Sequence, residues 1–158
     1  TAVHCTHTHP DDMRRYAETG AHVCLCPLTE ANLGDGIADV TGMRASGASL
    51  CLGTDSNARI SMLEEMRWCE YGQRLRDGRR GACTDDEGRI DRSLMEMATH
   101  GGAKSLGLAA GVLETGALAD VARIDLRHMA LQGVDANSIA NALITGADVP
   151  FVAGSSSV

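Results

Sequence analysis

An acidic residue follows a short apolar run in the first half of the chain. Residues 49–53 read Ser-Leu-Cys-Leu-Gly, and Asp55 comes two positions after the glycine. Such a run is typical of a buried strand, and polar side chains at the carboxyl ends of barrel strands line the active sites of (β/α)8 enzymes. Asp55 is therefore the first candidate for acid–base or metal chemistry. The competing interpretation is that Asp55 caps the turn or helix that follows.

Three histidines lie at and just after the end of the first apolar segment. His4 directly follows two apolar residues, whereas His7 and His9 come later, in the connection. Imidazole is the commonest metal ligand and the side chain best suited to proton transfer near neutral pH. We expect His4 to enter the same active-site mouth as Asp55, and His7 and His9 to be exposed. A hydrogen-bonded core histidine is the alternative interpretation of His4.

The chain has six cysteines: Cys5, Cys24, Cys26, Cys51, Cys69 and Cys83. We expect reduced, buried thiols, because four of these residues lie in apolar, strand-like runs where a free thiol behaves as a small hydrophobic group. A structural zinc site formed by Cys24, Cys26 and the early histidines is an alternative. The C-x-C spacing of that pair lacks the C-x2-C pattern of the usual zinc knuckle.

Strand-like and helix-like segments alternate through the first half of the chain. This order predicts parallel strands in an α/β fold. The predicted strands are 1–5, 21–26 and 49–53; the predicted helices are 10–19, 37–46 and 62–75; and 27–36 is predicted to be a loop because it contains proline and two glycines.

The helix predicted over 62–75 has an apolar and a charged side. Leu63, Met66, Cys69 and Gln73 are expected to face the core, and the methionines of this and other helices to be core residues. The acidic residues are expected to be solvated on the surface: Glu64, Glu65, Asp85, Asp86 and Glu87. Ser56 is expected to make a hydrogen bond beside Asp55 rather than to act as a nucleophile, because no glycine flanks it in a nucleophile-elbow pattern.

The pattern changes after a charged, glycine-containing connection. Helices are predicted at 93–99 and 103–106, a glycine-interrupted turn at 112–120, a strand at 121–126, a helix at 138–145 and a final strand at 149–152. Because the regular strand–helix alternation ends here, we predict a domain boundary near Val112.

Length and charge limit the class of protein. The 158 residues are few for a complete (β/α)8 barrel of about 250, and the chain begins without methionine, so we expect a piece of a longer protein. A net charge of −7 argues against a nucleic-acid partner, which needs clustered Lys and Arg. No apolar run approaches the roughly 20 residues of a membrane span, so we expect a cytoplasmic protein with no membrane partner.

Several motifs carry a resemblance to a known family. They are Val-His-Cys-Thr-His at 3–7, Cys-Pro-Leu-Thr-Glu-Ala-Asn-Leu-Gly-Asp-Gly at 26–36, Gly-Thr-Asp-Ser at 53–56, Glu-Glu-Met-Arg-Trp at 64–68 and Glu-Tyr-Gly-Gln-Arg-Leu at 70–75. Over nearly the whole chain, the sequence resembles the C-terminal part of the formimidoylglutamate deiminases of the amidohydrolase superfamily. The histidine, Cys-Pro and Gly-Thr-Asp-Ser elements are shared with guanine deaminases and so indicate only the superfamily. The longer motifs, Thr-Glu-Ala-Asn-Leu-Gly-Asp-Gly at 29–36 and Glu-Tyr-Gly-Gln-Arg-Leu at 70–75, are what narrow the resemblance to the formimidoylglutamate deiminases.

The resemblance implies a fold for each part of the chain. Residues 1–111 would be the C-terminal strand–helix units of a (β/α)8, TIM-like metallo-dependent hydrolase barrel. Residues 112–158, which include Gly-Ala-Leu-Ala-Asp at 116–120, would return into an incomplete small β-sandwich domain. Arg123 departs from the hydrophobic strand expected there.

The resemblance also implies an activity and two site residues. Asp55 is similar to the aspartate that ligates a divalent metal, most often Zn2+, and accepts a proton from the attacking water. His4 is similar to the histidine placed near that water. The implied reaction is hydrolytic deimination of a small-molecule substrate, N-formimidoyl-L-glutamate, to N-formyl-L-glutamate and ammonia in histidine degradation, with a homodimer as a possible assembly of the complete protein.

The remaining metal ligands of the family would lie upstream of this chain. Since a zinc site normally uses three or four protein ligands, we expect the chain alone to bind metal weakly and to be inactive. Two alternatives stay open. The first is a guanine deaminase-like aminohydrolase, and the second is a degenerate, non-catalytic module in which His4 and Asp55 only satisfy core hydrogen bonds.

Overall fold

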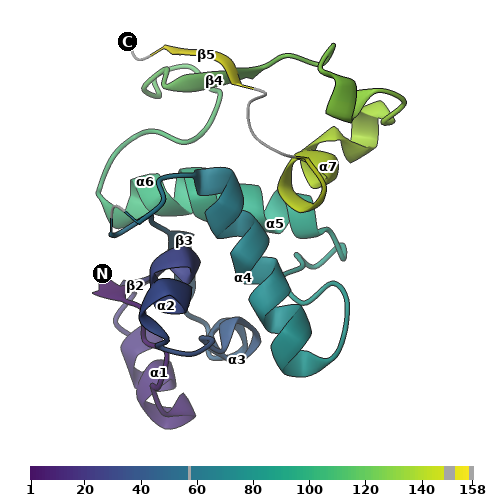
Figure 1. The fold of residues 1–158 in the computed structure, drawn as a ribbon. Coiled ribbons are helices and arrows are strands. Elements are labelled where there is room, and N and C mark those ends of the chain that lie inside the picture. The colour runs from purple at the N-terminus through teal and green to yellow at the C-terminus, as the bar shows by residue number, and fades with distance from the viewer. Residues whose placement is uncertain (57, 148–151, 157–158) are drawn as a thin grey trace.

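The computed structural model describes residues 1–56, 58–147 and 152–156 (Figure 1). The strands are β1 (Ala2–Val3), β2 (His22–Leu25), β3 (Ser49–Leu52), β4 (Val121–Ile124) and β5 (Val152–Ser156). The α-helices are α1 (Pro10–Ala17), α2 (Pro27–Leu33), α3 (Val40–Ala45), α4 (Met62–Asp77), α5 (Ile90–Glu96), α6 (Gly102–Ser105) and α7 (Ile139–Thr145). A π-helical turn (Met97–Gly101) joins α5 to α6, and 3-10 turns span Met129–Leu131 and Ala136–Ser138.

The first three strands form one parallel sheet in the order β1-β2-β3. Val23 of β2 is in register with Ala2 of β1 and with Leu50 of β3. The predicted α/β class with parallel strands is therefore confirmed. Because parallel strands end at the same edge, the segments that follow β1, β2 and β3 all begin at one rim of the sheet.

The core lies between this sheet and the helices that follow its strands. Alternate residues of β2, Val23 and Leu25, are buried, as are Leu50 and Leu52 of β3. Methionines fill much of the space against them, which confirms that the Met-rich helices supply core residues. The methionines of this cluster are Met13, Met43, Met66 and Met97. Their flexible side chains suit a core with few aromatic residues.

The prediction of a loop over 27–36 is wrong, because residues 27–33 form α2. Pro27 occupies the first turn, where its missing N–H costs nothing, and Gly34 ends the helix in the left-handed conformation with φ 74°. The proline and glycine that favoured a loop are thus the start and stop signals of a short helix.

The prediction for α4 is half correct. Met66, Cys69 and Gln73 are buried as expected, but Glu64 and Glu65 are only 7% and 0% exposed, which contradicts their assignment to the surface. Glu64 pairs with Arg67, whose guanidinium contacts the end of α7, and Glu65 accepts the N–H of Leu28 in α2. Since α4 packs against both α2 and α7, its charged side is covered as well.

The last part of the described chain contains a second, two-stranded sheet. β4 and β5 are antiparallel, with a register irregularity between Arg123 and Ile124. Arg123 therefore lies within a strand instead of ending it. The predicted final strand falls partly on residues 149–151, which lie outside the described residues. Figure 1 shows this sheet at the end of the molecule remote from α1, and the proposed boundary near Val112 stays a prediction.

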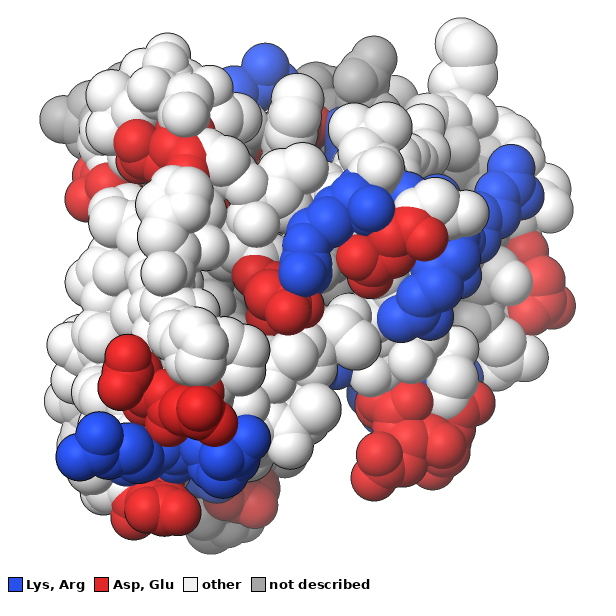
Figure 2. Space-filling view, turned by 90° about the horizontal axis from the view of Figure 1, so that it is seen from below, with Lys and Arg blue, Asp and Glu red and all other residues white. Residues whose placement is uncertain are grey.

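Charge is mixed on the face shown in Figure 2, where basic and acidic side chains lie next to one another. Among the described residues, ion pairs join Arg14 to Asp11 and Arg76 to Asp39. Within the described residues, none of the helices combines the length and the apolar character that crossing a bilayer requires.

Candidate active site

The carboxyl edge of the parallel sheet brings His4 and Asp55 together. His4 follows β1 and Asp55 lies three residues beyond the end of β3, yet His4 Nε2 is 3.5 Å from a carboxylate oxygen of Asp55. Both side chains are partly open, with exposed fractions of 32% and 42%. An imidazole and a carboxylate at one open rim can exchange protons with a molecule that enters from solvent.

The backbone is strained where these two residues lie. His4, Cys5 and Asp55 have φ values of 67°, 55° and 47°, and they are the non-glycine residues with positive φ in the described chain. This conformation costs energy for residues with a Cβ atom and is retained when surrounding contacts impose it. Such strain clusters at functional sites, so it marks this rim independently of the side-chain chemistry.

The first turn of α2 supplies the contacts that hold Asp55. Thr29, which is 2% exposed, accepts the N–H of Ser56 at 3.2 Å and lies 3.0 Å from the Ser56 hydroxyl. Its hydroxyl also contacts the carbonyl of Thr54 at 3.3 Å. One buried side chain therefore fixes the backbone on both sides of Asp55. The hydrogen bond expected of Ser56 is made to this threonine.

The neighbouring residue of α2, Glu30, contacts the histidine. Its Oε1 atom lies 3.2 Å from Nδ1 of His4 and accepts the N–H of Cys26 at 2.9 Å. The glutamate side chain is only 5% exposed. Sequence reasoning missed Glu30 because it treated this segment as a loop. The signal that could have found it is a Cys-Pro helix start with an acid in the first turn.

A third carboxylate, Glu65, lies behind α2 and is fully buried. One oxygen accepts the N–H of Leu28 at 2.9 Å, and within the described residues the other has no hydrogen-bond partner. Burial, together with the negative charges of Glu30 and Asp55, raises the pKa of Glu65 to about 7, although the hydrogen bond from Leu28 opposes this shift. Glu65 can therefore take up a proton near neutral pH.

The donor set at the rim suits a divalent metal. Ligand atoms of His4, Cys26 and Asp55 all lie within 4.8 Å of one another in the described part of the chain. Imidazole, thiolate and carboxylate are all zinc ligands, so these side chains fit the group that the fold implies. Of the two cysteines considered for a zinc site with the histidines, Cys26 belongs to this group and Cys24 does not.

The other two candidate histidines are exposed, as expected. The ring of His9 accepts the N–H of Asp11 at 3.3 Å and so caps α1. His7 is likewise outside the group of ligand atoms at the rim. All six cysteines are free thiols, and four of them are buried.

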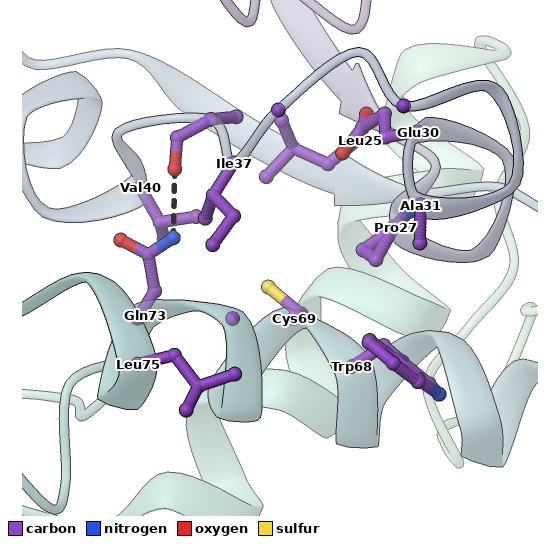
Figure 3. Close-up of a pocket in the computed structure, with 14 residues that line it drawn as sticks. Leu25, Pro27, Glu30, Ala31, Ile37, Val40, Trp68, Cys69, Gln73 and Leu75 are labelled. Atoms are coloured by element: carbon purple, nitrogen blue, oxygen red, sulfur yellow. Dashed lines mark hydrogen bonds between the residues drawn. The ribbon is translucent and has the colours of Figure 1, made fainter.

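A separate apolar cavity of about 280 Å3 lies between α2 and α4 (Figure 3). Figure 3 shows Ile37, Trp68 and Leu75 around it, with Gln73 donating to the carbonyl of Ala38 at 2.7 Å. Its lining contains Glu30 but neither His4 nor Asp55 among the described residues. The cavity therefore lies behind the site and is not its mouth.

Comparison with known proteins identifies the fold family. The model of the amidohydrolase family matches residues 1–154. This chain belongs to the amidohydrolase family. An amidohydrolase from Brucella melitensis, 34% identical, superposes with a TM-score of 0.82 over 91% of this chain and 32% of that one. A zinc-bound adenosine deaminase from Xanthomonas campestris, 26% identical, gives 0.79 over 90% and 32%.

Curated amidohydrolase relatives include deaminases of more than one kind. Formimidoylglutamate deiminase of Pseudomonas aeruginosa is 42% identical over 92% of this chain and 33% of its own length. The 5-methylthioadenosine/S-adenosylhomocysteine deaminase of Halobacterium salinarum is 37% identical over 78% of this chain and 28% of its own length. The chain thus spans about a third of the length of the relatives it matches, and its fold is that of part of an amidohydrolase.

Proposed function

We propose that this chain is the C-terminal part of a metal-dependent hydrolase that deiminates N-formimidoyl-L-glutamate to N-formyl-L-glutamate and ammonia. The observation that carries the proposal is the contact of His4 with Asp55 at the carboxyl edge of the sheet. The choice of substrate is supported by the 42% identity to formimidoylglutamate deiminase, which exceeds the identity to the adenosine-type deaminase.

In this proposal Asp55 holds the metal, His4 lies beside it, and the other ligands come from a part of the complete protein upstream of this chain. A divalent ion lowers the pKa of a bound water from about 15.7 to about 7. The Asp55 carboxylate accepts the proton of the attacking water and returns it to the leaving nitrogen. His4, whose Nε2 faces the same space, accepts a hydrogen bond from the water that adds to the imine carbon.

The products follow from the balance of atoms. Water adds across the carbon–nitrogen double bond of the formimino group to give a tetrahedral carbon. Loss of the terminal nitrogen as ammonia leaves the carbonyl of the formyl group. The side chains of the protein need only transfer protons in this reaction, and a carboxylate beside an imidazole can do so.

The test is ammonia release by the complete protein that contains this chain. We expect turnover of formimidoylglutamate to exceed turnover of guanine and of 5-methylthioadenosine. Asp55→Asn is expected to abolish turnover, and a chelator is expected to remove activity that added zinc restores. Preferred turnover of 5-methylthioadenosine would instead support the adenosine-type function, and unchanged turnover in Asp55→Asn would support a non-catalytic module.

The described residues of this chain offer too few ligands for tight binding. Even if both His4 and Cys26 joined Asp55 as ligands, the three donor atoms would be spread over distances of up to 4.8 Å. We therefore expect weak, substoichiometric zinc binding by the purified 158-residue chain in equilibrium dialysis. Tight one-to-one binding would contradict this expectation.

A further inference from the structure

The buried carboxylate of Glu30 contacts the histidine of the proposed site. Its Oε1 atom has two neighbours, the backbone nitrogen of Cys26 at 2.9 Å and Nδ1 of His4 at 3.2 Å. The side chain is 5% exposed, so water does not replace either contact. A buried carboxylate is costly unless donors surround it, and His4 provides the donor that the backbone does not.

This contact constrains the imidazole at one end. A carboxylate is only an acceptor, so a hydrogen bond to Nδ1 requires the proton to be on Nδ1. The partner of one ring nitrogen fixes both the tautomer and the orientation of the other. With Nδ1 turned to Glu30, Nε2 is the atom that lies 3.5 Å from Asp55.

We propose that Glu30 is a positioning residue that holds Nδ1–H of His4 and thereby directs Nε2 toward Asp55 and the substrate. This inference rests on the proposed function, because the orientation of Nε2 affects turnover only if His4 and Asp55 act at the substrate. Glu30 itself touches neither the metal nor the substrate in this role.

Helix capping alone does not require this arrangement. Glu30 accepts the N–H of Cys26, the residue before α2, much as a capping box does. A cap needs only that contact and does not need an acceptor shared with a ring 26 positions earlier in the chain. The backbone of His4 has a strained φ of 67°, so the ring is held from two directions, by its main chain and by Glu30.

The test uses the complete protein with 15N-labelled histidine and two variants. At about pH 8 we expect the ring nitrogen signals of His4 to show the proton on Nδ1. Glu30→Ala is expected to lose that tautomer preference. It is also expected to lower kcat about 10- to 100-fold with little change in KM, as for other partners of active-site histidines.

Glu30→Gln is the conservative variant, because its amide oxygen still accepts from Nδ1 and from Cys26. We expect it to keep the Nδ1–H tautomer and most of the turnover. Asp39→Ala is the control for the loss of a helix cap, because it removes the hydrogen bond from Gly42 at 2.9 Å that caps α3, together with the ion pair of Asp39 with Arg76. We expect Asp39→Ala to lower stability but to leave the His4 signals and kcat unchanged.

Three outcomes would overturn the inference. One is an unchanged tautomer and kcat in a folded Glu30→Ala protein, and another is a loss of kcat in Glu30→Gln as large as in Glu30→Ala. If Glu30→Ala fails to fold, the test depends on Glu30→Gln alone. The third overturning outcome is then a Glu30→Gln protein that loses the Nδ1–H signal but keeps full turnover. Full activity of Asp55→Asn would instead remove the proposed function, so the two failures are distinguishable.

Discussion

The hydroxyl of Thr29 lies 3.0 Å from the hydroxyl of Ser56 and accepts the backbone N–H of the same serine at 3.2 Å. Thr29 belongs to α2 and Ser56 follows Asp55, so the helix after β2 supports the turn after β3. Two neighbouring residues of α2 thus serve the two candidate residues: Thr29 supports Asp55, and Glu30 contacts His4.

We predict that Thr29→Val weakens the site. Valine keeps the shape of threonine but leaves the Ser56 N–H and the Thr54 carbonyl without this partner, which costs about 1–3 kcal/mol for buried groups. Because Asp55 needs this support to hold its strained conformation, zinc affinity of the complete protein is expected to fall about 10- to 100-fold. Urea unfolding of the chain and zinc titration of the complete protein measure the two effects.

Two variants serve as controls for Thr29→Val. Thr29→Ser keeps the hydroxyl and is expected to retain most of the zinc affinity. Thr145→Val removes a hydroxyl that donates to the carbonyl of Asn141 within α7, at 2.8 Å. Zinc affinity equal to that of the unmodified protein in Thr29→Val would show that this hydroxyl does not support Asp55.

The sequence was sufficient for the parallel sheet and for the candidate pair. Strand-like runs and the residues just after them are local features, and parallel strands must end at one edge. His4 and Asp55 therefore fall at the same rim whatever surrounds them. The helix α2 was missed because proline and glycine occur both in loops and at the two ends of helices.

Burial of the charged residues of α4 could not be predicted in the same way. Glu65 is covered because Leu28, 37 positions earlier, donates to it. Arg67 is covered because it donates to Ile144, 77 positions later. Helical periodicity shows which residues share a side of a helix, but not whether a second element packs on that side.

A second prediction concerns Gly53, at the end of β3. A Cβ atom added there would lie 2.9 Å from Sγ of Cys24, closer than real Cβ contacts allow. We expect Gly53→Ala to lower the free energy of unfolding by about 1–3 kcal/mol, as overpacking does. Urea unfolding of the variant measures this cost.

The clash predicts a specific rescue. Adding Cys24→Ala removes the sulfur, so the double variant is expected to be more stable than the sum of the two single effects. Gly102→Ala is the control, because its added Cβ would have nothing closer than 3.9 Å and would favour the helix by about 0.5–1 kcal/mol. Strict additivity of Gly53→Ala and Cys24→Ala would rule out the contact as the cause.

The raised pKa of Glu65 predicts a pH-dependent stability. Burial raises the pKa from 4.5 to about 7 in the folded chain, so the folded state binds the proton more tightly than the unfolded state. The stabilisation is therefore fully present below pH 4.5 and is lost as the pH rises through about 7. A shift of this size corresponds to about 3 kcal/mol.

Glu65→Gln isolates this effect, because glutamine is uncharged at every pH and still accepts from Leu28. The unmodified chain is expected to lose stability from pH 4.5 to about 7, whereas the variant is not. The free energy of unfolding of the variant relative to the unmodified chain is therefore expected to increase over this range and then to stay constant. Urea unfolding at a series of pH values measures it. Glu18→Gln, at the exposed end of α1, controls for the removal of a surface carboxylate, and a difference independent of pH would contradict the prediction.

The last prediction concerns Arg67, which joins α4 to the end of α7. Its side chain is 13% exposed and donates to the carbonyls of Ile144 at 2.6 Å and Leu143 at 3.2 Å while pairing with Glu64. Carbonyls at a helix end lack partners within the helix, and the helix dipole favours a cation there. Arg67→Met leaves these carbonyls and Glu64 uncompensated, so the free energy of unfolding is expected to fall by about 3 kcal/mol, with faster hydrogen exchange in α7.

Arg14→Met is the control. Arg14 also pairs with a carboxylate three residues away, Asp11, but this pair is exposed on the surface, so its loss is expected to cost less than about 0.5 kcal/mol. Equal effects of the two substitutions would show that Arg67 does not hold α7.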